Sequence, residues 1–135
     1  MASPDPAKAI KTALATEWLT THPTWTVTLH VDDDYLPIAG SPTLLVADDG
    51  GPRIVGDSWT VRKTPRRPLI RLTAFAVGRD EAIGCVDAAV DDILANRPAA
   101  ISRFEDVSNP LVTRDRSTGA FLASITVPVI VRQPA

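Results

Sequence analysis

The chain has 135 residues, 44% of them hydrophobic and 22% charged, which is the composition of a single soluble globular domain. A formal net charge of −2 argues against a protein whose affinity comes from neutralising many phosphates. One cysteine excludes an intrachain disulfide, and no apolar run approaches the ~20 residues that a membrane-spanning helix needs. We therefore expect one domain over residues 1–135, with no signal peptide and no membrane association.

The first predicted element is a helix over residues 6–21. Apolar residues recur at four-residue spacing from Ile10 to Trp18 and form one stripe. Asp5 can accept hydrogen bonds from the free N–H groups of the first turn. Pro23 forces the residue before it out of the helical region, so the helix is expected to end there.

Two strands are expected to follow this helix. Apolar residues alternate with threonine and histidine over residues 25–31, the pattern of a strand with one buried face. The adjacent carboxylates of residues 32–34 end it. A second apolar run at residues 42–47 stops at the Asp-Gly-Pro turn signal of residues 48–52. Residues 53–61 are compatible with a further strand, and the sequence leaves that open.

The middle of the chain combines a basic segment, a strand and a helix. Residues 62–68 are basic and contain prolines, which cannot donate to a sheet, so a loop or the fringe of an edge strand is expected. Residues 69–77 are apolar on both faces of a strand, which indicates a central or doubly covered position. A helix is predicted over residues 78–96, because acidic residues fill its first turn and apolar residues form one stripe.

The last third is predicted to form two strands, at residues 101–107 and 121–131, joined by a loop. The second strand is a long alternation of apolar residues, and Pro128 indicates an edge or a bulge in its C-terminal half. The predicted fold class is therefore α+β. We expect a mostly antiparallel sheet with an N-terminal helix and a second, central helix packed on it.

No catalytic or cofactor motif is visible. His22 lies beside a proline and His30 on the polar face of a predicted strand, and neither has metal-ligand spacing. A solvated loop is favoured over a cation site for residues 32–34, because three adjacent carboxylates cannot all point at one ion. Cys85 falls inside a helical pattern, where a lone cysteine acts as a small apolar residue. We expect no enzymatic activity, no cofactor and no metal.

One local charge anomaly is a basic segment near a tryptophan. Three explanations stay open: a phosphate-binding patch, an interface loop that meets an acidic neighbour, and a loop that is merely solvated. Between the two specific explanations the interface is favoured, because the chain is acidic overall and no aromatic residues interleave the basic ones for base stacking. Tryptophan and arginine also anchor many protein interfaces. The candidate residues are Trp59, Arg62, Lys63, Arg66, Arg67 and Arg71.

The order of these elements resembles that of the tail terminator, or tail completion, proteins of long-tailed bacteriophages (siphophages). The likeness is carried by PTLLVADDGGPRIVGD, by RKTPRRPLIRLTAFAVGRDEAIGCVDAAVDDIL and by ISRFEDVSNPLVTRDRSTGAFLASITVPVIVR. In that family a central strand feeds a helix like the one predicted at residues 78–96, and a linker and a long final strand follow. The likeness covers about three quarters of the chain, from Pro42 onward, and is one of pattern rather than of a diagnostic motif.

The resemblance implies a structural virion protein, assembled in the host cytoplasm, that forms a hexameric ring around the channel through which genomic DNA passes. Such a ring stops tube growth at the head-proximal end of the tail. It contacts the tail-tube protein and the head–tail connector protein, and the genomic DNA passes through its lumen without sequence-specific binding. Each contact in such a ring joins one patch to a different patch on the next copy.

Two parts of the chain are candidates for these contacts. One is the segment of residues 56–67. The other is the final strand, because a strand edge is a ready site for pairing with a neighbour. Its candidate residues are Ile125, Val127, Val129 and Val131.

Three other functions stay open. A stopper or tail-tube subunit would also be small and rich in sheet, although the chain lacks the long hairpin pair with which tube subunits build an inner barrel. A small enzyme or ligand-binding domain would need a concave pocket with convergent polar groups. A nucleic-acid-binding adaptor would bind DNA with strong salt dependence.

Overall fold

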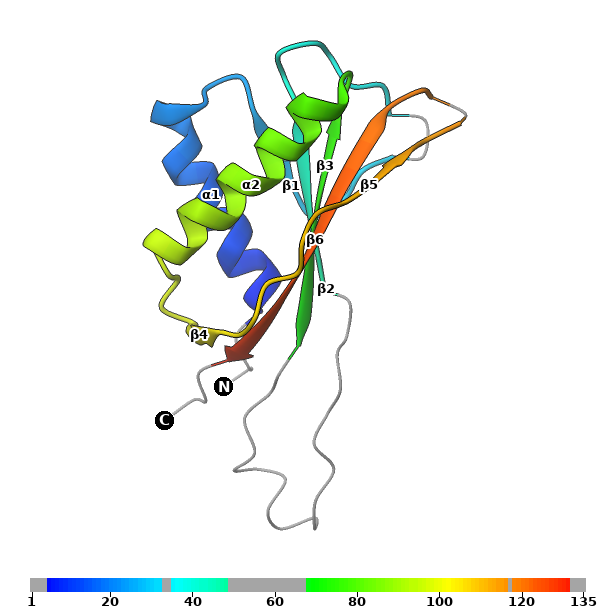
Figure 1. The fold of residues 1–135 in the computed structure, drawn as a ribbon. Helices are drawn as coiled ribbons and strands as arrows, with labels where there is room; N and C mark the ends of the chain where they lie inside the picture. The colour runs from blue at the N-terminus through cyan, green and yellow to red at the C-terminus, as the bar shows by residue number, and fades with distance from the viewer. Residues whose placement is uncertain (1–4, 33–34, 49–67, 117, 132–135) are drawn as a thin grey trace.

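Two helices lie on one face of a six-stranded sheet, and together they enclose the core (Figure 1). This arrangement comes from a computed structural model, which describes residues 5–32, 35–48, 68–116 and 118–131. The predicted α+β class is confirmed, with an N-terminal and a central helix packed on the sheet. The elements are α1 (Pro6–Thr21), β1 (Thr26–Thr28), β2 (Thr43–Asp48), β3 (Leu69–Ala76), α2 (Arg79–Ala95), β4 (Ile101–Phe104), β5 (Leu111–Arg114) and β6 (Phe121–Val131).

Helix α1 begins and ends where its capping residues predict. The Asp5 carboxylate accepts a hydrogen bond from the Lys8 N–H at 3.2 Å, and Pro6 occupies the first turn, where its missing donor has no partner to lose. At the other end, the His22 N–H donates to the Trp18 carbonyl. Three residues of the predicted stripe are buried against the sheet and α2: Ile10, Leu14 and Trp18.

A partly buried hydrogen bond joins the two helices at the margin of the core. The Trp18 indole Nε1 donates to Oδ2 of Asp92 on α2 at 2.7 Å. The Trp18 ring also meets the edge of Trp25 at 5.1 Å between centroids, and His22 stacks on Trp25 at 3.7 Å. Because a buried indole N–H without an acceptor is costly, Asp92 fixes how α1 and α2 sit against each other.

Cys85 lies on the buried side of α2, as its place in the helical pattern predicts. Burial, with a smaller effect of the nearby Glu81 carboxylate, raises the pKa of its thiol to about 12. The side chain therefore stays a neutral thiol and packs as a small apolar group.

The sheet has the strand order β1-β2-β3-β6-β4, and β5 also pairs with β6. β3 is central and pairs antiparallel with both β2 and β6, as a strand that is apolar on both faces predicts. The pairing of β1 with β2 is parallel, so the sheet is mixed rather than wholly antiparallel. Alternation in the sequence reports which side chains share a face and carries no information about strand direction.

β1 is shorter than the strand predicted over residues 25–31. The Thr28 hydroxyl donates to the His30 carbonyl at 3.0 Å and accepts from the His30 N–H at 3.2 Å. These local bonds take the backbone groups that a longer strand would offer to its neighbour, so the ladder stops at Thr28.

The C-terminal third differs from its prediction in two ways. The strand expected over residues 101–107 ends at Phe104, and a separate strand, β5, lies within the expected loop. Between these strands the chain still follows β6. The Glu105 N–H donates to the Pro128 carbonyl, and the Ser108 N–H donates to the Thr126 carbonyl.

Pro128 does not mark an edge strand, and the register shift in this half of β6 lies beyond it, opposite Ile101 and Arg103. β6 lies between β3 on one side and both β4 and β5 on the other. The Val129 N–H points to β3, where it donates to the Pro68 carbonyl, so the missing donor of Pro128 faces the opposite side. Pro128 lies in the part of β6 between the residues that pair with β4 and those that pair with β5. No strand there needs an N–H donor from this position.

Within the described residues, neither helix is long and apolar enough to span a membrane.

Candidate functional site

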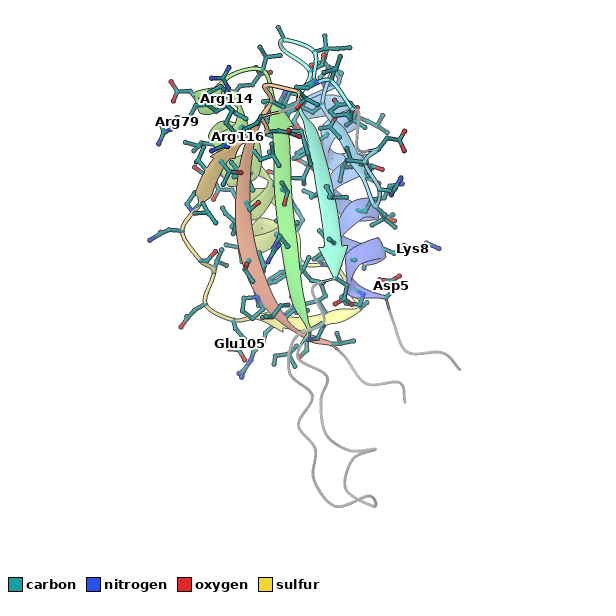
Figure 2. All side chains as sticks on the ribbon, turned by 90° about the vertical axis from the view of Figure 1, so that its right-hand side faces the viewer. Asp5, Lys8, Arg79, Glu105, Arg114 and Arg116 are labelled. Carbon is teal, nitrogen blue, oxygen red and sulfur yellow. The ribbon has the colours of Figure 1, made fainter. Side chains whose placement is uncertain are left out.

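The sheet has one face that no helix of the described chain covers, and we call it the open face (Figure 2). Successive side chains of a strand point to opposite sides, so this face is built from the residues that alternate with the core set. The register of the strands places these residues on it: Thr26, Thr28, Thr43, Leu45, Ala47, Leu69, Arg71, Thr73, Phe75, Leu111, Thr113, Leu122, Ser124, Thr126 and Pro128.

The hydroxyl groups at the centre of the open face bond to one another. The Thr73 and Ser124 hydroxyls lie 3.0 Å apart across β3 and β6. The Tyr35 hydroxyl lies 2.6 Å from that of Thr43, and its ring meets the edge of Phe75 at 6.1 Å. Because these hydroxyls already have partners, a protein that covered them would leave few polar groups unsatisfied.

Arg71 is the one charged member of the open face. It is exposed and lies between Ala47 and Thr126 in the strand register. The other members are apolar or carry hydroxyls, which favours contact with another protein over contact with a highly charged polymer.

The final-strand candidates lie on the wrong side of β6 for an interface. Ile125, Val127, Val129 and Val131 are all buried in the core beneath the helices. β6 can therefore meet a neighbour only through the alternate set, which includes Ser124 and Thr126. A signal was present in the sequence, because the more apolar of two alternating sets is the one expected in the core.

The basic-segment candidates divide between described and undescribed parts of the chain. Arg71 is placed on the open face. Trp59, Arg62, Lys63, Arg66 and Arg67 lie outside the described residues, as does the segment 56–67 as a whole.

A hollow lies at the β1 edge of the open face, and we call it the edge hollow. It has a volume of about 380 Å³, and its lining includes Thr26 and Thr28 of β1, Tyr35, Ile38 and Thr43. The Ile38 side chain is 69% exposed. Asp32, which also lines the hollow, lies 3.2 Å from His30 Nε2, and both of these side chains remain exposed.

The chain that borders the edge hollow is tied to the rest of the fold. The Gly40 N–H donates to Oε1 of Glu81 on α2 at 2.9 Å, and the Thr24 hydroxyl donates to the Gly40 carbonyl at 2.9 Å. Gly40 has φ +79°, a conformation that glycine adopts without strain. These bonds tie the chain between Ile38 and Thr43, which lines part of the hollow, to α2 and to the start of β1.

A larger groove of about 690 Å³ runs between α1 and the C-terminal end of α2. Its lining includes alanine and threonine residues of α1, with Lys8 and Glu17 among its charged residues. The Asp92 carboxylate also lines it and accepts the Trp18 indole hydrogen bond. This groove offers a shallow packing surface rather than a set of converging catalytic groups.

In the described parts of the chain, no group of three or more His, Cys, Asp or Glu side chains is placed to hold a metal ion. Of the acidic run at residues 32–34, Asp32 alone is described. The thiol of Cys85 is buried and has a raised pKa, so it is a poor nucleophile.

No family model matches the chain, and no curated protein is significantly similar to it.

Proposed function

We propose that this chain is a structural subunit that assembles with copies of itself into a ring, and that the ring is the tail terminator of a long-tailed bacteriophage. The observation that carries the first half of this proposal is the open face, where apolar side chains alternate with hydroxyls that are already paired. Covering such a surface with another protein costs little free energy, because few hydrogen-bonding groups lose their partners.

The size of the open face supports the same proposal. β3 has 8 residues, so it is about 26 Å long at ~3.3 Å per residue. Five strands at ~4.8 Å spacing add a width of about 24 Å. Because β1 has 3 residues and β5 has 4, the face covers roughly 500 Å², a little under two thirds of the ~800 Å² that each partner buries in a stable interface.

The second half of the proposal rests on the resemblance to tail terminators. The helix that follows the central strand, together with the long final strand, has the order expected for that family. In this role the ring caps the head-proximal end of the tail tube, contacts the tube protein and the connector protein, and surrounds the DNA channel.

Removal of this chain from a phage that encodes it tests the role. A tube whose end is not capped keeps accepting subunits, so we expect filled heads and unattached tails of variable length. Electron microscopy of the lysate measures both, and supplying the chain in trans should restore joined tails of one length. Joined tails of normal length in its absence would refute the terminator role.

A further inference from the structure

The two edges of the open face carry complementary features, and we infer that Leu111 of one copy inserts into the edge hollow of the next. This inference rests on the proposed self-assembly and names the surfaces that make it. Leu111 lies on β5, pairs with Ser124 of β6, and is 67% exposed. Burial of this side chain, which we call the knob, against a neighbouring subunit would stabilise the contact.

The strand register places Leu111 and the edge hollow at the two ends of one cross-strand row. Leu111 is the partner of Ser124, which pairs with Thr73, which pairs with Leu45, which pairs with Thr28. Thr28 lines the edge hollow. One row across the sheet therefore begins at the hollow and ends at Leu111.

This placement has a consequence for symmetry. The contact is head-to-tail, since each copy offers a knob on one side and a hollow on the other. Repeated with the correct angle, such a contact closes into a ring.

Charge at the two edges fits the same pairing. Arg116 follows Leu111 and is exposed near the end of the β5–β6 hairpin, whereas the Arg114 guanidinium lies 5.3 Å from the centre of the Phe121 ring (Figure 2). Asp32, with a side chain that is 78% exposed, lies at the hollow. Exposed pairs of this kind add little strength but select the partner and its register.

Engineered cysteines test the contact directly. Cys85 is buried with a raised pKa, so Leu111→Cys and Ile38→Cys each carry one reactive thiol. We expect disulfide-linked dimers when the two variants are mixed and oxidised, and few when either is oxidised alone. The double variant should give a ladder of linked species. Dimers that form as readily within one variant as in the mixture would overturn the head-to-tail assignment.

Loss of the knob provides the second test. Leu111→Asp and the milder Leu111→Ser should weaken self-association tenfold or more, as measured by light scattering. Leu94→Asp is the matched control, because Leu94 is also an exposed leucine, 51% exposed, but lies on α2. Unchanged assembly of both Leu111 variants would overturn the inference.

The outcomes separate this inference from the proposed function. If the wild-type protein assembles but the cysteine variants do not cross-link and Leu111→Asp assembles normally, the contact between Leu111 and the edge hollow is refuted. The proposed ring is then untouched. Wild-type protein that never associates refutes both.

Discussion

Trp18→Ala should lower the free energy of unfolding by about 3–5 kcal/mol, the cost of removing a large buried aromatic side chain. Trp18 is almost wholly buried between α1, α2 and the start of the sheet, and it meets Trp25 edge-on. Its loss leaves a cavity and removes the indole N–H that donates to the Asp92 carboxylate. Urea denaturation followed by circular dichroism measures the change.

Two variants show whether burial and the buried hydrogen bond cause this effect. Leu19→Ala, one position along on the exposed side of α1, should change the free energy of unfolding by at most about 0.5 kcal/mol. Asp92→Ala leaves the indole donor unsatisfied and should cost about 1–3 kcal/mol, more than Asp91→Ala on the exposed side of α2. Equal effects of Trp18→Ala and Leu19→Ala would contradict the packing of α1 described above.

Val127→Asp should abolish folding, whereas Thr126→Asp should leave a folded chain that assembles poorly. Val127 points into the core beneath the helices, where an unpaired carboxylate has no counter-charge. Thr126 is only half buried and pairs with Arg71 in the register of the open face, so a carboxylate there stays solvated and near a guanidinium. Circular dichroism measures folding, and light scattering measures assembly.

This pair of neighbouring substitutions separates the two faces of β6. A Val127→Asp variant that folds but assembles poorly would show that the side of β6 that carries Val127 is the interface. A Thr126→Asp variant that assembles as well as the wild type would remove the open face from the interface at this position.

Elements with strong local signals could be predicted from the sequence to within one or two residues. α1 is bounded by Asp5 and the His22-Pro23 junction, and these local effects fix its ends. β6 alternates over its whole length, so its bounds follow from the pattern alone. In each case the information lies in the segment itself.

Features that depend on partners distant in the sequence could not be predicted. β5 has only 4 residues, two apolar and two polar, and its hydrogen bonds to β6 make it a strand. The parallel direction of β1 depends on how the chain returns to β2. The edge hollow forms where β1 meets the residues around Ile38, and the cross-strand row that ends at Leu111 requires the full register.

The candidate site was predicted less well than the fold. Arg71 does lie on the open face, but the apolar candidates of β6 are core residues. Apolar character marks burial, and a sequence does not say whether burial is by the chain itself or by a neighbour. The threonine and serine positions that the structure places on the open face gave no such signal.

The mass of the purified chain in solution tests the central claim most directly. Light scattering over a concentration series should show a species of about six times the 14.5 kDa of one chain, the ring size that the resemblance to tail terminators implies. Micrographs of the same sample should show closed particles with a central hole. A single-chain mass at every concentration, with no closed particles, would contradict the account.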